Sequence, residues 1–288
     1  MRLKHKVVLV TGAGRGLGSG IASGLISEGS HVIILDINPE EMSQTTQEIN
    51  RTGNEVMSIV ADVSNYTSMT NAINQIRVKW NRLDAVICNA ATMPLVPFKD
   101  TSPKIWGSIL GTNLTGVYNT IKASWKLLKE NNGGHYISIA SRASLLGFED
   151  EVAYCASKHG LEGLTKALAM EFEQHNIAIN TMGPGKPIKP TSMTREQAKA
   201  IKESQKTKWI NPVLLAPAFT WLLSQPPKNH TGLRFDAGPI VDTINKEGYD
   251  FVFTPEKTTL YTHDLINRIQ QRHQWSIHKT DQQQPITN

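Results

Sequence analysis

Short runs of β-branched and other apolar residues alternate with longer segments of helical periodicity along most of this chain. The runs occupy residues 7–10, 32–35, 56–60, 85–88, 136–140 and 177–180. Between them, apolar residues recur three and four positions apart, which places them on one face of a helix. Such alternation is typical of a parallel sheet that is covered by helices on both faces. The sequence therefore predicts an α/β fold with a doubly wound parallel sheet, whose ligands bind where the strands end.

The chain has 288 residues, and we expect a single domain over residues 1–245 and a polar C-terminal extension over residues 246–288. The extension is rich in Gln, Thr and His, and it is expected to be partly disordered or to contact another subunit. An irregular segment at 186–211 is rich in Pro, Lys, Thr and Gln. We predict that this segment is a substrate loop over the mouth of the site, with a plain surface loop as the alternative.

Charge and composition exclude several classes of protein. The net charge of +5 is small and the 30 Lys and Arg residues are scattered, so we expect no nucleic-acid partner. No apolar stretch approaches the roughly 20 residues of a membrane span, and no signal peptide is recognisable. The two cysteines, Cys88 and Cys155, make neither a disulfide framework nor a metal-ligand motif. These features predict a cytoplasmic protein without a membrane partner or a bound metal.

A glycine-rich turn follows the first strand and opens a helix. It reads Thr11-Gly12-Ala13-Gly14-Arg15-Gly16-Leu17-Gly18. Glycines let the chain turn sharply, let backbone approach a pyrophosphate, and let a helix pack tightly on the sheet. The N-terminus of the helix then presents backbone N–H groups and a positive dipole to phosphates. A glycine-rich turn alone is a weak signal, but the position between strand and helix predicts a dinucleotide site in a Rossmann-type fold.

Polar residues at the ends of the next strands extend this predicted site. Asp36 ends the second strand, and its carboxylate could bind both hydroxyls of an adenosine ribose while repelling a 2′-phosphate, which favours NAD over NADP. The alternative is an Asp that only caps the helix starting near residue 39. Arg15 favours NADP instead, because a basic side chain here could hold a 2′-phosphate. Asp62-Val63 and Asn89 end the third and fourth strands and are expected on the same rim.

A tyrosine and a lysine four residues apart are candidates for proton transfer. Tyr154 and Lys158 lie near the start of a predicted helix, and their separation places them on one face, one turn apart. A nearby ammonium favours the phenolate, so we expect Lys158 to lower the pKa of Tyr154 toward neutrality. Lys158 could also bind the ribose beside the nicotinamide. As an isolated motif, the pair would more often be an ordinary surface pair.

Two further residues support the catalytic interpretation. Ser141 ends the fifth strand, 13 residues before Tyr154, where its hydroxyl could polarise the same carbonyl oxygen as the phenol. Ser138 is the rival serine, but it lies inside the strand and is expected to be packed. Asn113 interrupts a helical pattern where Asn is mildly unfavourable, and a water that relays protons to Lys158 would account for it.

Together these residues resemble the short-chain dehydrogenase/reductase family, in its single-domain, NAD(P)-dependent branch. The resemblance covers about residues 5–240 and rests on the following motifs in the order of the family: Thr11-Gly12-x-x-x-Gly16-x-Gly18, Asp62-Val63, Asn89-Ala90, Asn113, Ser141, Tyr154-x-x-x-Lys158 and Pro184-Gly185. It implies a catalytic tetrad of Asn113, Ser141, Tyr154 and Lys158. It also implies a homotetramer or dimer built on the helices around 114–130 and 153–173.

The resemblance implies an enzyme that interconverts an alcohol and a ketone or aldehyde by hydride transfer, with NAD preferred and NADP as the alternative. The expected cofactor contacts are Gly12, Arg15, Gly16, Leu17, Gly18, Asp36, Asp62, Val63, Asn89, Tyr154 and Lys158. The small-molecule substrate is expected to meet residues 93–98, 142–148 and 186–211. A regulator that senses NAD without turnover is the alternative function, although such a sensor has no need of the tyrosine and the lysine.

Overall fold

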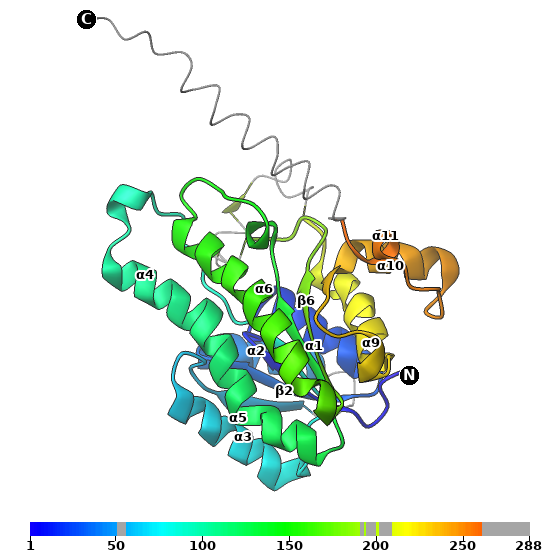
Figure 1. The fold of residues 1–288 in the computed structure, drawn as a ribbon. Helices are drawn as coiled ribbons and strands as arrows, with labels where there is room; N and C mark the ends of the chain where they lie inside the picture. Colours follow the sequence, from blue (N-terminus) through cyan, green and yellow to red (C-terminus); the bar gives the residue numbers. More distant parts are fainter. Residues whose placement is uncertain (51–55, 191–192, 194–199, 202–208, 261–288) are drawn as a thin grey trace, which may run out of the picture.

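A computed structural model describes residues 1–50, 56–190, 193, 200–201 and 209–260. In this part of the chain, strands and helices alternate and build one seven-stranded sheet with helices on both sides (Figure 1). The strands are β1 (Val7–Thr11), β2 (His31–Asp36), β3 (Val56–Val60), β4 (Ala85–Cys88), β5 (Gly134–Ile139), β6 (Ile177–Gly183) and β7 (Arg234–Asp236). The predicted doubly wound α/β fold is confirmed.

The order of the strands is β3-β2-β1-β4-β5-β6-β7, and all neighbouring pairs are parallel. The chain first builds outward from β1 to β3, then returns to the other side of β1 and continues from β4 to β7. The direction of winding therefore reverses between β1 and β4. In open sheets of this kind, the crevice outside the carboxyl ends of the two strands at such a reversal is the usual ligand site.

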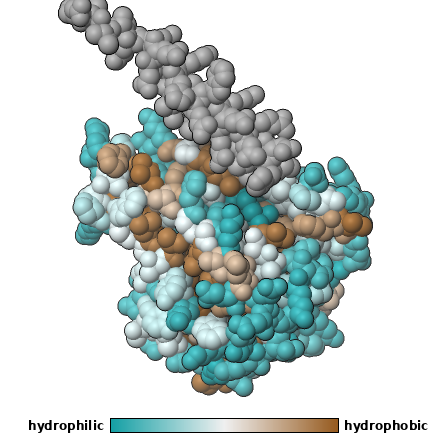
Figure 2. Space-filling model, viewed as in Figure 1, coloured by the Kyte–Doolittle hydropathy of each residue, from teal (hydrophilic) through white to brown (hydrophobic). Residues whose placement is uncertain are grey.

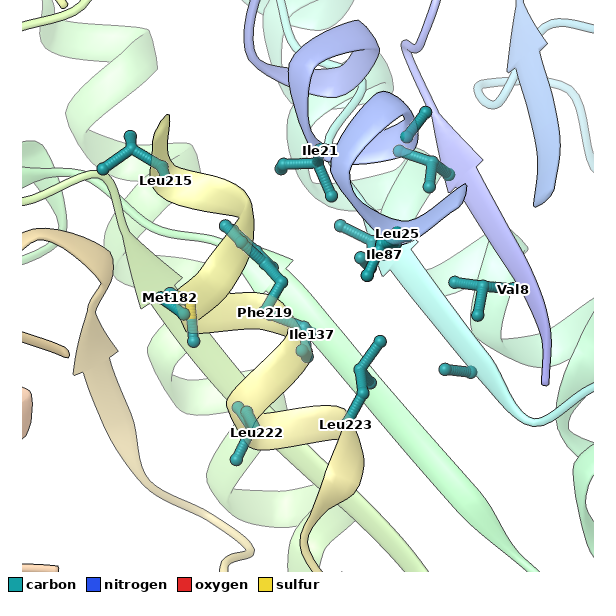
Figure 3. Close-up of a cluster of buried hydrophobic side chains, with 14 of the residues drawn as sticks. Val8, Ile21, Leu25, Ile87, Ile137, Met182, Leu215, Phe219, Leu222 and Leu223 are labelled. Carbon is teal, nitrogen blue, oxygen red and sulfur yellow. The ribbon is translucent and has the colours of Figure 1, made fainter. Parts of the chain in front are cut away.

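Successive side chains of a strand point to opposite faces, and each face of this sheet carries its own core. On one side, Val8 and Val10 of β1 pack with residues of α1 (Gly16–Ser27) and α9 (Ala216–Ser224), as Figure 3 shows for the cluster around Phe219. The alternate residues Val7 and Leu9 join the cluster on the other face. The sheet is thus apolar on both sides, which explains the continuous apolar runs of its strands.

The remaining helices form the two outer layers. One layer contains α3 (Tyr66–Trp80), α5 (Gly116–Glu130) and α6 (Val152–Phe172), with the short helix α4 (Pro103–Leu110) leading into α5 (Figure 1). The other contains α1, α9 and α10 (Ala237–Glu247), and α2 (Pro39–Asn50) lies between β2 and β3 in the chain. No helix in the described part of the chain is both long and apolar enough to cross a membrane.

The first residues of the predicted extension pack on the domain. Residues 249–260, with the short helix α11 (Pro255–Thr258), follow α10, and Phe251 stacks on Trp221 of α9 with ring centroids 4.9 Å apart. The proposed boundary at residue 245 lies inside α10, and the division into domain and extension stays a prediction. The C-terminal residues from 261 and most of the predicted substrate loop lie outside the described residues.

Candidate active site

The glycine turn after β1 forms a tight backbone cradle. Gly12 and Gly16 have φ of +63° and +60°, a conformation that side chains other than glycine rarely adopt. A Cβ atom on Gly12 would lie 2.6 Å from the Cα of Ala90, and one on Gly18 would lie 2.4 Å from the carbonyl oxygen of Gly12. In front of Gly16 there is open space. The turn therefore leaves room for a ligand at Gly16 and closes tightly against its neighbours elsewhere.

Asn89, at the end of β4, locks this turn in place. Its Nδ2 donates to the carbonyl oxygens of Thr11 and Gly12, at 2.9 and 2.8 Å. In return, the Thr11 hydroxyl accepts hydrogen bonds from the backbone N–H groups of Asn89 and Ala90. Asn89 therefore holds together the two strand ends at which the sheet order reverses, and it fixes the cradle through hydrogen bonds to its backbone carbonyl groups.

Asp36 at the end of β2 is fixed by backbone donors. One carboxylate oxygen accepts from the N–H of Gly14 at 2.9 Å and the other from the N–H of Asn38 at 3.1 Å. The cap of α2 is Asn38, whose side chain accepts from the backbone of Glu40 and Glu41. The structure thus removes the alternative in which Asp36 only caps the following helix.

Arg15 carries a positive charge at the same end of the site. Its guanidinium pairs with Glu41 in the first turn of α2, with Nη1 and Oε1 3.6 Å apart. Both side chains are partly buried, at 35% and 17% exposure. Arg15 was among the predicted cofactor contacts, and Glu41 was not. The acidic residues that directly follow Asn38-Pro39 were a signal that could have placed Glu41 near the glycine turn.

A cavity of about 360 Å³ runs along the ends of the strands at this reversal point. The predicted cofactor residues that line it are Gly12, Arg15, Gly16, Leu17, Asp36, Asp62, Val63 and Asn89. Thr92, Ile188 and Lys189 also line it, so the segment after β6 faces the glycine turn across the cavity. One oxygen of Asp62 accepts from the backbone and the hydroxyl of Ser64, which gives this carboxylate a local role in its own turn.

Ser141, Tyr154 and Lys158 come together at the end of β5. Ser141 caps the short turn at Arg142–Ser144, and its hydroxyl lies close enough to the Tyr154 side chain to lower the pKa of the phenol. Lys158 is buried, its Nζ donates to the carbonyl oxygen of Ile139 at 2.7 Å, and it lies 5.5 Å from the centre of the Tyr154 ring. The rival serine, Ser138, is buried inside β5. The three side chains therefore share one small volume, as their spacing predicted.

The ionisation of this pair differs from the expectation. Burial raises the pKa of Tyr154 to about 12, against the lowering effect of the Ser141 hydroxyl. Burial also lowers the pKa of Lys158 to about 8, while the charge of Glu162 raises it. The prediction that Lys158 brings the phenol toward neutrality is wrong for this geometry, because the ammonium bonds a backbone carbonyl and burial outweighs its attraction.

Asn113 lies in a π-helical turn, Gly111–Thr115, between α4 and α5. The simple helix expected around it is therefore corrected to an interrupted one, and such turns occur frequently at functional sites. The amide of Asn113 bonds both backbone groups of Thr92, and it donates to the Ser157 hydroxyl at 3.2 Å. Thr92 lines the cavity and Ser157 lies between Tyr154 and Lys158 on α6, so Asn113 joins the cavity wall to the proton-transfer pair.

A parallel sheet with a glycine cradle at its point of reversal defines a dinucleotide-binding protein of the Rossmann class. Residues 6–202 match the model of the short chain dehydrogenase family. The chain belongs to this family of NAD(P)-dependent oxidoreductases that act on CH–OH groups.

Named relatives and solved structures agree with this assignment. The chain is 32% identical to a cyclopentanol dehydrogenase of Comamonas sp. over 225 residues, which is 78% of this chain and 86% of the relative. It is 32% identical to D-threitol dehydrogenase of Mycolicibacterium smegmatis over 64% of this chain and 70% of the relative. A putative short-chain alcohol dehydrogenase of Sinorhizobium meliloti superposes with a TM-score of 0.73 at 28% identity, covering 82% of this chain and 95% of that one. A Shigella flexneri short chain dehydrogenase complexed with NADP gives 0.72 at 28% identity, covering 83% and 99%.

Proposed function

We propose that this protein interconverts an alcohol and a ketone or aldehyde with a nicotinamide cofactor, and that Tyr154 transfers the proton. The observation that carries the proposal is the grouping of Ser141, Tyr154 and Lys158 at the end of β5. This group lies at the same edge of the sheet as the glycine cradle, because the carboxyl ends of parallel strands meet at one edge. A hydride acceptor and a proton acceptor are both needed to oxidise a CH–OH group.

Each residue has a separate task in this proposal. When bound, the nicotinamide cofactor supplies or takes the hydride. Ser141 holds the substrate oxygen, and Tyr154 gives it a proton or removes one. Lys158 orients the ribose and replaces the proton on the phenol. Asn113 is a positioning residue through Thr92 and Ser157, and its part in a proton relay stays a prediction.

The acidic end of the cavity supports NAD as the preferred cofactor. Asp36 lines this end of the cavity, where its carboxylate can accept hydrogen bonds from a ribose diol and would repel a 2′-phosphate. Some related structures contain NADP, so membership of the family does not by itself favour NAD. The preference therefore depends on residues of this chain at the ribose end.

The substrate class that we propose is a small alcohol or the corresponding carbonyl compound. Relatives include dehydrogenases of D-threitol, cyclopentanol and (-)-trans-carveol. Cζ of Arg142, the residue that follows Ser141, lies 5.1 Å from the centre of the Phe148 ring, and Lys189 lines the cavity that contains the glycine cradle. These residues belong to the segments 142–148 and 186–211, which we propose as the walls of the substrate site.

We also propose that the protein is a homo-oligomer that associates through α5 and α6. A hollow of about 480 Å³ lies between these helices and is lined by apolar side chains that include Tyr118, Trp125, Leu164 and Leu168. Figure 2 shows apolar residues gathered on the side of the molecule formed by α4, α5 and α6. Exposed apolar area of this kind is typical of interfaces between subunits.

The substitution Tyr154→Phe tests the proposed function. It removes one oxygen and leaves the ring, so NADH binding should persist while turnover of alcohols and carbonyl compounds falls by roughly 10²- to 10⁴-fold. NADH binding is followed by nicotinamide fluorescence, and turnover by absorbance over a panel of secondary alcohols and ketones. Normal turnover in the variant would refute the role of the phenol. Tight NADH binding without turnover of any panel member by the natural protein would favour the NAD-sensing alternative.

A further inference from the structure

We infer that Glu41 makes this protein selective for NAD over NADP by engaging the guanidinium of Arg15 in the wall of the cavity. The inference rests on the proposed function, because it concerns the nucleotide that the cavity would hold. It assigns the selectivity to two acidic residues with different tasks. Asp36 repels a 2′-phosphate directly, whereas Glu41 acts through Arg15, whose guanidinium would otherwise attract that phosphate.

Glu41 is held in place by the way α2 is fastened to the glycine turn. The side chain of Asn38 accepts from the backbone N–H of Glu41 at 3.1 Å and thereby caps the helix. One turn further along, the hydroxyl of Thr45 donates to the carbonyl oxygen of Gly14 at 2.6 Å. The first turn of α2 is thus fixed against the turn that carries Arg15. The backbone of Glu41 is therefore held near Arg15 by these contacts as well as by the attraction between the two charged side chains.

The two charged side chains meet inside the cavity wall. Glu41 Oε1 lies 3.6 Å from Arg15 Nη1, and both residues line the cavity that holds the glycine cradle and Asp36. The N-terminal dipole of α2 favours a negative charge in its first turn. At 17% exposure, Glu41 is shielded from solvent more than most surface acids, so water screens its attraction for Arg15 only in part.

Gly14 brings the acids close to each other. A Cβ atom on Gly14 would lie 2.9 Å from Asp36 Oδ2 and 3.1 Å from Glu41 Cβ, so both side chains pack on this glycine. Among the described residues, this part of the wall therefore carries the carboxylates of Asp36 and Glu41 and the guanidinium of Arg15. A phosphate monoester brings about −1.5 to −2 further charge to this end, whereas a ribose diol brings none. A guanidinium already paired with a carboxylate offers such a phosphate less net attraction.

The substitution Glu41→Gln tests the inference with a binding measurement that needs no substrate. Fluorescence titration of the full chain with NADH and NADPH gives the ratio of the two Kd values. We expect the ratio of NADPH Kd to NADH Kd to fall about tenfold in the variant, equivalent to about 1.4 kcal/mol. Glu40→Gln is the matched control, because Glu40 lies next to Glu41 in the same helical turn, is exposed and does not line the cavity. Its ratio should equal that of the natural protein.

The role of Arg15 is tested with two further variants. Arg15→Ala alone should change the ratio by less than about twofold, since Glu41 already engages the guanidinium. In the double variant Arg15→Ala/Glu41→Gln, the gain of the single Glu41→Gln variant should disappear. A gain that persists without Arg15 would overturn the inference, because Glu41 would then act by direct repulsion.

Other outcomes decide between the inference and the proposed function. If the Glu41→Gln variant shows the ratio of the Glu40→Gln control, the inference is wrong while the proposed function stands. If circular dichroism shows that Glu41→Gln does not fold, the Arg15→Ala variant alone decides. A tenfold rise in the ratio would show that Arg15 binds a 2′-phosphate in the natural protein, which would overturn the inference. If the natural protein binds neither NADH nor NADPH, the proposed function fails and the inference fails with it.

Discussion

The phenol of Tyr154 and the ammonium of Lys158 both lie in the interior, and burial shifts the pKa of each so that the neutral form is favoured. The pKa of Tyr154 rises to about 12 and that of Lys158 falls to about 8. The phenol is thus protonated at neutral pH, which is the form that the proposed donation of a proton to a carbonyl oxygen requires. Above about pH 8 the lysine loses its charge, and with it the ability to resupply that proton. Glu162, one turn along α6 from Lys158, counteracts this loss.

A glycine is required at position 18 for steric reasons that can be tested. In Gly18→Ala the new Cβ would lie 2.4 Å from the carbonyl oxygen of Gly12 and 2.5 Å from Nδ2 of Asn89, which holds the cradle. Overpacking of this kind costs about 1–3 kcal/mol of stability. Because the cradle must shift to admit the methyl group, we also expect NADH affinity to fall by roughly tenfold or more. Fluorescence titration measures the affinity, and thermal unfolding measures the stability.

Gly107→Ala is the matched control for this prediction. Gly107 lies inside α4, is exposed, and has no atom within 4 Å of the position of a new Cβ. Alanine is a better helix former, so this variant should keep its NADH affinity and gain up to about 1 kcal/mol of stability. Equal NADH affinity in the two variants would show that the packing at Gly18 does not shape the site.

At the scale of elements, the helices α5 and α6 differ from those on the other face of the sheet. On that other face, α1 approaches α9 so closely that a Cβ atom on Gly24 would lie 2.1 Å from the Cβ of Ala216. Between α5 and α6 there is instead a hollow of about 480 Å³, whose walls contain apolar side chains together with Lys122 and Glu171. The first pair buries its apolar surface within the chain, whereas the second pair leaves apolar surface exposed, as the proposed subunit interface requires.

The substitution Tyr118→Lys tests whether that partner is a second copy of the chain. Tyr118 lines the hollow and is 49% exposed. An ammonium buried in an interface is costly, and Lys122 in the same wall adds a like charge, although the carboxylate of Glu171 in that wall offsets part of the cost. We therefore expect self-association to weaken by roughly tenfold. Analytical ultracentrifugation over a concentration series measures this change.

Val78→Lys is the control for this substitution. Val78 is an apolar residue that is 88% exposed on α3 and does not line the hollow. Its change to lysine should leave the association constant as it is. If Tyr118→Lys and the natural protein sediment alike, the face between α5 and α6 is not the interface.

At the scale of the whole molecule, stability should depend on pH through His135. This residue lies in β5 at the end of the sheet opposite the site, and its Nε2 donates to the carbonyl oxygen of Gln225 at 3.0 Å. Burial lowers its pKa from 6.5 to about 4. Between these values the unfolded chain binds the proton and the folded protein does not, so this group makes stability fall as pH falls from about 6.5 to 4.

The shift corresponds to about 3 kcal/mol of stability lost over that range. His135→Gln keeps a donor for Gln225 and cannot titrate, so its urea unfolding free energy should fall less between pH 6.5 and 4 than that of the natural protein. Chemical denaturation at several pH values measures both curves. Parallel curves for the two proteins would contradict the prediction.

The strands, the glycine turn and the group formed by Ser141, Tyr154 and Lys158 could all be predicted from the sequence. Each depends on local periodicity or on residues that a strand end or a helical turn brings together. Glu41 and Thr45 contact the glycine turn from a helix about 30 residues later in the chain. The acidic first turn of that helix was the one local signal for Glu41, and no local pattern pointed to Thr45. The π-helical turn at Asn113 was also missed, because helical periodicity does not reveal one inserted residue.

The sequence by itself determined the type of fold and the edge of the sheet at which chemistry can occur, since strand period, helix period and glycine positions are local properties. Only the tertiary structure decided the charge states and the partners of the site residues. Burial depends on everything that packs around a group, and it reversed the expected direction for the pKa of Tyr154. The same packing placed Glu41 beside Arg15, so the side chain that the sequence analysis considered as a holder of a 2′-phosphate is paired with a carboxylate in the folded protein.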